Sequence, residues 1–120
     1  MALIFVYGTL KKGKSLNFYL KNATFLEEGV TLLPYPLIVK PGKWYPYLLN
    51  LPGKGYRVRG EIYRLDFQIL KKLDRLEEVP HYYRRAKIRV RGALSHRTYH
   101  LWTYFHLSKS YRKRWLLSQF

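Results

Sequence analysis

The sequence predicts an α+β fold, a small mixed or mainly antiparallel β-barrel with flanking helices, from three features. An apolar run from Ala2 to Tyr7 ends at a glycine, which is typical of a strand covered on both faces. The stretches Tyr56 to Leu65 and Arg84 to Val90 alternate between apolar and charged side chains, the period of a half-buried strand. Between them, Asp66 is a suitable N-cap for one dominant helix, Phe67 to Glu77. Strands combined with one such helix predict an α+β domain.

The other segments are assigned from local composition. Four prolines between Pro34 and Pro46 break any regular element there. Pro80 disfavours helical geometry in the residue before it and therefore ends the long helix. The remaining assignments are a short helix over Ser15–Lys21, strands over Thr24–Leu33 and Thr98–His106, and a turn over Leu51–Gly55.

The chain length fits one domain with a single core. We expect a domain over residues 1–107 and a basic C-terminal segment, 108–120, that packs on it or extends from it. That segment is expected to form a short helix, with Tyr111 and Trp115 four residues apart on one face.

Composition limits the class of protein. The 120 residues carry 23 Lys and Arg against 7 Asp and Glu, a net charge of +16, which favours contact with nucleic acid or other anions. No apolar stretch approaches the roughly 18 residues of a membrane span, and the apolar start has no basic region before it, unlike a signal peptide. The chain has no cysteine, which fits a cytoplasmic location and excludes thiolate chemistry.

Glu77 is the acidic residue with the most unusual expected surroundings. It shares one face of the predicted helix with Leu70 and Leu73, so it should point partly inward. Burial raises the pKa of a carboxyl, and the negative end of the helix dipole acts in the same direction. A general base requires a pKa near neutrality. The alternative is a partly exposed ion pair between Glu77 and His81, Arg84 or Arg85.

The loop Tyr7-Gly8-Thr9-Leu10 follows the first strand directly. A loop of this kind can present backbone N–H groups to a carboxylate or an oxyanion. Gly8 would allow a close backbone approach or an unusual φ. The alternative is an ordinary turn that ends a strand.

Six segments in register give these features a family context. They are Phe5–Gly13, Tyr35–Leu37, Leu48–Gly53, Val58–Tyr63, Leu73–Glu77 and Pro80–Arg84. Together they resemble the γ-glutamyl cyclotransferase family, and specifically its γ-glutamylamine cyclotransferase branch, over about residues 3 to 105. The resemblance implies a γ-glutamyl cyclotransferase-like barrel and an enzyme that needs no cofactor and no metal.

The resemblance also implies a reaction and a site. A small γ-glutamyl compound is converted to 5-oxoproline with release of an amine or amino acid, because the substrate's own α-amine attacks its γ-carbonyl. Glu77 matches the family's catalytic glutamate, and residues 7 to 10 match its substrate-binding loop. Tyr83 and Tyr104 lie where a pocket aromatic could reach the substrate. The amine half of the substrate and the oligomeric state are left open.

Two other functions compete with this one. Nucleic-acid binding is the first, because alternation places basic side chains on the outer face of two strands: Arg57 and Arg59 on one, and Arg85, Lys87, Arg89 and Arg91 on the other. The opposite face would carry Tyr56, Val58, Ile62, Ala86, Ile88 and Val90, and Glu61 would share the basic face. Gly60 within the strand suggests a bulge or a close backbone approach. A non-catalytic interaction protein on the same fold is the second alternative.

Overall fold

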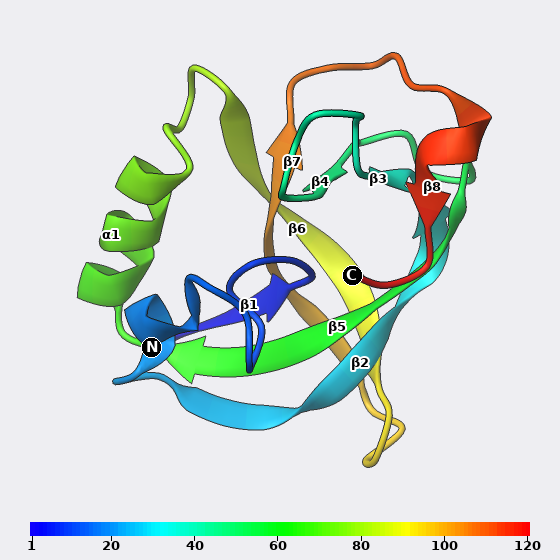
Figure 1. The fold of residues 1–120 in the computed structure, drawn as a ribbon. Coiled ribbons are helices and arrows are strands. Elements are labelled where there is room, and N and C mark those ends of the chain that lie inside the picture. The colour runs from blue at the N-terminus through cyan, green and yellow to red at the C-terminus, as the bar shows by residue number, and fades with distance from the viewer.

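The computed structural model describes residues 1–120 and contains a closed five-stranded barrel with one long helix at its side (Figure 1). The strands of the barrel are β1 (Ala2–Val6), β2 (Thr24–Tyr35), β5 (Tyr56–Leu65), β6 (Tyr83–Gly92) and β7 (Thr98–His106). Their order around the barrel is β1-β5-β2-β6-β7, and all neighbours are antiparallel except β1 and β7. The predicted α+β barrel is confirmed.

The barrel interior forms one of two main cores. Val58, Ile62, Ile88 and Val90 point into it as the alternation predicts, together with Phe5, Leu101 and Phe105. Tyr56 was expected on the same face but is 54% exposed, because it begins β5 beside the turn that precedes the strand. Alternation of side chains with a period of two residues therefore predicts which residues face the barrel interior, except at the start of β5.

Helix α1 (Phe67–Leu76) packs against the outside of the barrel and forms the second core. Asp66 caps it as predicted, because its Oδ1 accepts a hydrogen bond from the N–H of Ile69 at 2.8 Å. Leu70 and Leu73 are buried against outward-facing residues of β1 and β5. The segment expected to be a short helix near Ser15 is a single 3₁₀ turn, η1 (Asn17–Leu20), beside α1.

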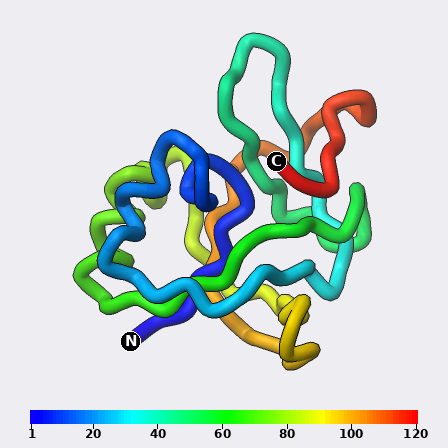
Figure 2. The backbone as a smooth tube through the Cα atoms, turned by 60° about the horizontal axis from the view of Figure 1, so that its bottom comes forward, coloured from blue at the N-terminus to red at the C-terminus, as the bar shows by residue number.

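A small second sheet lies at the opposite end of the molecule from α1, and it corrects two predictions (Figures 1 and 2). Its strands are β3 (Leu37–Ile38), β4 (Tyr47–Leu48) and β8 (Leu116–Leu117). The predicted C-terminal helix is wrong: the tail forms one 3₁₀ turn, η2 (Lys113–Trp115), and then pairs with β3. The stretch after Pro34 is also less irregular than expected, since Pro34 itself lies in β2 at a shift of register.

Gly60 and Glu61 show how closely β5 contacts the segments next to it. A Cβ on Gly60 would lie 2.4 Å from the carbonyl oxygen of Val6, so the expected close backbone approach is present. Glu61 was expected to be exposed beside the arginines of β5, but only 6% of it is accessible. The loop after β1 covers it, and its Oε1 accepts hydrogen bonds from the Lys12 N–H and the Tyr63 hydroxyl.

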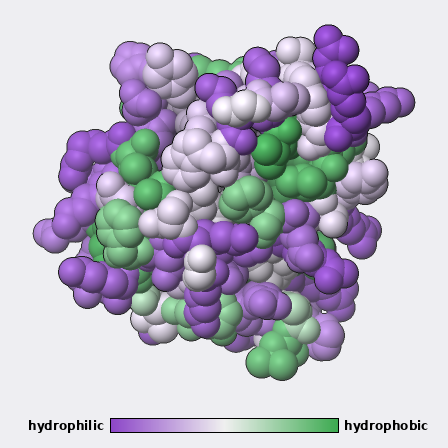
Figure 3. All heavy atoms as spheres, in the orientation of Figure 1, coloured by the Kyte–Doolittle hydropathy of each residue, from purple (hydrophilic) through white to green (hydrophobic).

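The surface is strongly hydrophilic. In the space-filling view, hydrophilic side chains make up much of the outline, and the apolar groups form separate patches between them, one of them at the lower edge (Figure 3). None of the helices has both the length and the apolar character that crossing a bilayer requires.

Candidate active site

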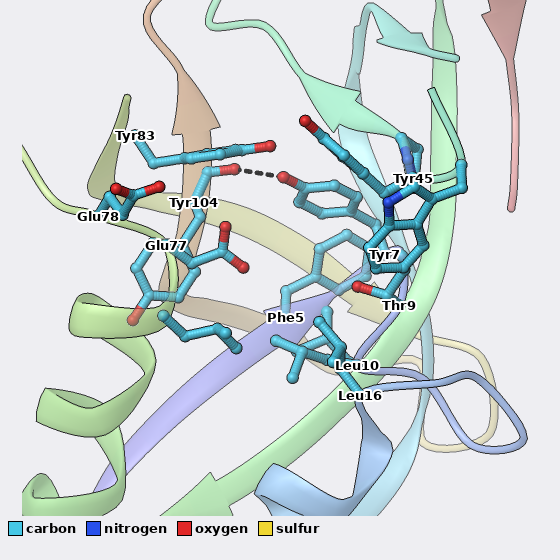
Figure 4. A pocket seen from close by; sticks show the side chains of 15 residues that line it. Phe5, Tyr7, Thr9, Leu10, Leu16, Tyr45, Glu77, Glu78, Tyr83 and Tyr104 are labelled. Atoms are coloured by element: carbon cyan, nitrogen blue, oxygen red, sulfur yellow. Dashed lines mark hydrogen bonds between the residues drawn. The ribbon is translucent and has the colours of Figure 1, made fainter. Parts of the chain in front are cut away.

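One cavity of about 230 Å³ lies where the C-terminal end of α1 meets the loop that follows β1 (Figure 4). All seven residues that the sequence singled out line this cavity. They are Tyr7, Gly8, Thr9, Leu10, Glu77, Tyr83 and Tyr104. Segments that are about 70 residues apart in the chain, residues 7–10 and Glu77, are thus brought to one place.

Glu77 ends α1 and directs its carboxylate into the cavity (Figure 4). Its N–H still donates to the Leu73 carbonyl at 2.9 Å, so the last helical turn fixes where the side chain begins. The carboxylate forms no salt bridge, which makes the alternative ion pair with His81, Arg84 or Arg85 wrong. Burial raises the pKa of Glu77 from 4.5 to about 7. The carboxyl can therefore both accept and return a proton near neutral pH.

The loop after β1 forms the wall that faces Glu77. A Cβ on Gly8 would lie 2.9 Å from Cγ of Pro46, so glycine is needed for close packing there. The alternative reason, an unusual φ, does not apply, because Gly8 is not among the glycines with positive φ. The backbone N–H groups of Gly8, Thr9 and Leu10 donate to no acceptor within the protein. Since buried N–H groups are usually paired, these donors suit a ligand oxygen.

Three tyrosines complete the cavity, and burial is the main reason why the pKa of each is raised. They therefore remain neutral phenols at physiological pH. The Tyr7 hydroxyl donates to the Tyr104 carbonyl at 2.7 Å, which ties the loop to β7. The Tyr104 hydroxyl donates to Asp74 at 2.7 Å, away from the cavity, so only its ring lines the site. The charge of Glu77 contributes to the raised pKa of Tyr83, which lies beside it.

Trp44, Tyr45 and Pro46 also line the cavity, and sequence reasoning missed them. They lie in the proline-rich stretch, which has no strand or helix period. The available signal was composition: two consecutive aromatic residues between Pro41-Gly42 and Pro46, where a simple surface loop would be polar. Trp44 is 62% exposed at the mouth of the cavity, and its ring meets that of Tyr45 edge to face at 5.2 Å.

Asp74 connects the helix that carries Glu77 to two barrel strands. It accepts hydrogen bonds from the Tyr104 hydroxyl and, at 2.9 and 3.2 Å, from the guanidinium of Arg85. Arg85 also lies 4.3 Å from the ring centre of Trp102. Because Asp74 precedes Glu77 by one helical turn, these contacts fix the end of α1 on the barrel.

Coupling between Asp74 and Tyr104 is open to a direct test. We expect Asp74→Ala and Tyr104→Phe each to lower the free energy of unfolding by about 1–2 kcal/mol, and the double variant to lose less than the sum. Denaturant unfolding of the four proteins measures this coupling. Asp66→Ala combined with Tyr104→Phe is the control and should be additive, because Asp66 lies two helical turns from Asp74. Additivity in the first pair would contradict the contact.

The raised pKa of Glu77 also predicts a pH dependence of stability. The folded pKa of about 7 exceeds the unfolded value of 4.5, so the folded state binds the proton more tightly. Wild-type protein should therefore lose up to about 3 kcal/mol as pH rises from 4.5 through 7. Glu77→Gln should be more stable than wild type at pH 8 and similar to it at pH 4.5. Urea unfolding at both pH values measures the difference, and equal differences at the two would refute the assignment.

Comparison with known proteins places the chain in a family. The profile described as "Gamma-glutamyl cyclotransferase, AIG2-like" matches residues 4–118 of the chain. The chain belongs to this family. Human gamma-glutamylaminecyclotransferase is 44% identical over 95 residues, which are 75% of this chain and 62% of that protein. Gamma-glutamylaminecyclotransferase B of Danio rerio is 45% identical over 95 residues, covering 75% of this chain and 50% of that protein. The chain thus matches between half and two thirds of the length of these relatives.

Solved structures agree with the family assignment. The crystal structure of an AIG2-like protein from Mus musculus superposes with a TM-score of 0.87 at 34% identity, covering 100% of this γ-glutamyl cyclotransferase-family chain and 88% of the mouse chain. An uncharacterised protein from Pyrococcus horikoshii gives a TM-score of 0.64 at 31% identity, with 91% and 80% covered.

Proposed function

We propose that this protein is a cofactor-independent cyclotransferase that converts a γ-glutamyl amine to 5-oxoproline and the free amine. The α-amine nitrogen of the substrate attacks its γ-carbonyl carbon, and a new C–N bond closes the five-membered ring. The bond between that carbon and the leaving amine then breaks. The attacking ammonium carries three hydrogens and the lactam nitrogen keeps one, so two protons pass to the leaving nitrogen. Glu77 accepts the first before the attack and returns it to the leaving nitrogen. It then accepts the second from the ring nitrogen and passes it to the departing amine, so no proton is gained or lost overall.

The observation that carries this proposal is Glu77 itself. A carboxyl with a pKa of about 7, without an ion-pair partner, faces a cavity with unpaired backbone donors on the opposite wall. An α-ammonium has a pKa of about 8, so proton transfer from it to Glu77 is nearly balanced in free energy. The N–H groups of Gly8, Thr9 and Leu10 would bind the substrate carboxylate or the developing oxyanion. Catalysis by positioning suits an intramolecular reaction, because nucleophile and electrophile already belong to one molecule.

The charge of the cavity favours an amine over an amino acid as the leaving half. Its lining includes the carboxylates Glu77 and Glu78 but no lysine, arginine or histidine, in a chain of net charge +16. A second carboxylate on the substrate would meet like charge there. An amine half agrees with the printed name of the human relative.

The test is release of 5-oxoproline from a matched panel. Three γ-glutamyl compounds with a four-carbon amine half differ only in its end: an ammonium, a methyl group or a carboxylate. We expect release from the first two, with the carboxylate compound having the lowest kcat/KM by about tenfold or more. No 5-oxoproline from any member would refute the proposed function, and a preference for the carboxylate would refute the choice of the amine.

A further inference from the structure

Net charge is distributed unevenly along this chain, because all seven acidic residues precede Val79. The last 42 residues, from Val79 onward, contain ten lysines and arginines and no aspartate or glutamate. Four of the seven acidic residues lie instead on α1 and its two ends: Asp66, Asp74, Glu77 and Glu78. The helix side of the protein is therefore nearly balanced in charge, and the excess lies on other elements, above all on β6, which carries five lysines and arginines.

Within this basic half, β6 carries four of its five cations in one row, and Arg84 lies on the other face. Its outward-facing residues are Arg85, Lys87, Arg89 and Arg91, which we call the β6 track. All but Arg85 are exposed, and only Arg85 forms a salt bridge. The registered partners of Lys87, Arg89 and Arg91 on β7 are Trp102, His100 and Thr98. On the other side, β2 pairs Val30 with Arg91. No neighbouring strand therefore places an acid directly opposite these three cations, and Glu28 on β2 is diagonal to Arg91 alone.

The geometry of the row points to a linear polyanion. Alternate residues of a strand lie about 6.7 Å apart, so the four cations span about 20 Å in a line. Three unpaired like charges on one strand repel one another, which a bound polyanion would relieve. From this row we infer that the β6 track binds the phosphate backbone of a single-stranded nucleic acid.

A single strand fits this surface better than a duplex or a membrane. The outer face of a closed barrel is convex, so a stiff duplex can follow the row only over a short contact, whereas a flexible single strand can bend along it. The exposed imidazole of His100 lies beside Arg89 and can stack on an unpaired base, which a duplex keeps inside. Stable membrane binding combines cations with apolar residues that enter the lipid, and the track itself presents only cations. Leu94 in the β6–β7 hairpin and Leu33 on β2 are exposed, but neither belongs to the track.

The track is separate from the proposed catalytic cavity. None of its four residues lines that cavity, and Arg85 reaches it only through Asp74. Nucleic-acid binding would therefore be a second activity of the chain, and it can be removed without loss of the first.

Fluorescence anisotropy with labelled 20-nucleotide poly(dT) and poly(U) tests the inference. Each phosphate neutralised on a single strand contributes about −0.7 to the slope of log K against log salt, so the three unpaired cations predict a slope of about −2. The variant Lys87→Gln, Arg89→Gln, Arg91→Gln should reduce that slope to near zero. It should also lower affinity at least tenfold at 100 mM NaCl, with 5-oxoproline release and melting temperature retained.

A matched variant controls for net charge. Lys71→Gln, Lys72→Gln, Arg75→Gln removes the same three charges from the exposed face of α1 and should bind within about twofold of wild type. Equal losses in both variants would overturn the inference, because they would indicate attraction by net charge alone. Failure of wild type to bind either oligonucleotide at 50 mM NaCl would also overturn it. So would binding to phosphatidylserine vesicles without binding to oligonucleotides, which would assign the surface to lipid.

Discussion

Glu77→Gln is expected to lower 5-oxoproline release by at least 100-fold and up to about 10⁴-fold, because general acid–base catalysis contributes that much. Glutamine keeps the length and shape of the side chain, so the cavity and its loop should not move. It cannot accept a proton from the substrate ammonium. Binding should persist, so the loss should appear in kcat while KM changes by less than about threefold. Coupled detection of 5-oxoproline measures both quantities.

Glu78 is the matched control for this variant. It follows Glu77 directly and also borders the cavity, but it is exposed. Glu78→Gln should therefore keep kcat within about threefold of wild type. Because a base acts when it is deprotonated, wild-type kcat/KM should rise with pH through about 7, the pKa of Glu77. Equal losses of kcat in the two variants would contradict the assignment of Glu77. A wild-type kcat/KM that does not rise with pH near 7 would contradict it as well.

Most of the fold was predictable because its signals are local. The bounds of β5 and β7 match the expected ranges to the residue, since alternation and β-branched or aromatic composition mark both. The cap at Asp66 and the buried face of α1 follow from spacing alone. The tail could not be assigned in this way. Leu116 and Leu117 pair with β3, 78 and 80 residues earlier along the chain, and only that distant partner makes them a strand.

Most of the residues that line the candidate site could be predicted from the sequence, but the directions of their side chains could not. Glu77 was found because an acid on an apolar helix face is unusual, and the loop was joined to it by family resemblance. Helix spacing could not show that Tyr104 turns its hydroxyl to Asp74, since β7 and α1 meet only in the folded barrel. Trp44 and Tyr45 were missed for a related reason. Packing of Pro46 against Gly8 brings them to the cavity, and no periodic pattern records that contact.

Glu27 provides an instructive contrast, because it is another buried glutamate with the opposite surroundings. It is 7% exposed at the base of the β6–β7 hairpin. Its carboxylate accepts hydrogen bonds from the N–H groups of Leu94 and Ser95, and from the hydroxyls of Ser95 and Tyr99. The bonds from Ser95 and Tyr99 are the main reason why its pKa falls from 4.5 to about 2. Glu27 is therefore a permanent anion that holds the hairpin, whereas Glu77 can exchange a proton.

Glu27→Gln should consequently destabilise the protein and leave the reaction intact. Glutamine replaces one carboxylate oxygen with an NH₂ group, which cannot accept a hydrogen bond from the donors that face it. At least one of the four hydrogen bonds is therefore lost, and the others weaken. We expect the melting temperature at pH 7 to fall by roughly 5 °C or more. 5-Oxoproline release well below that temperature should be unchanged, because Glu27 does not line the cavity that Glu77 faces.

The melting temperature at acidic pH gives a sharper test of the role of Glu27. Its folded pKa of about 2 lies below the unfolded value of 4.5, so its contribution is present above pH 4.5 and is lost as pH falls toward 2. The difference in melting temperature between wild type and Glu27→Gln should therefore shrink from pH 5 to pH 2.5. The exposed neighbour Glu28 is the control, and Glu28→Gln should match wild type throughout. A constant difference across this range would show that the destabilisation arises from altered packing. Glu27 changes the stability of the folded protein below pH 4.5, and Glu77 changes it above pH 4.5. Unfolding measured across the whole pH range therefore separates the contributions of the two glutamates.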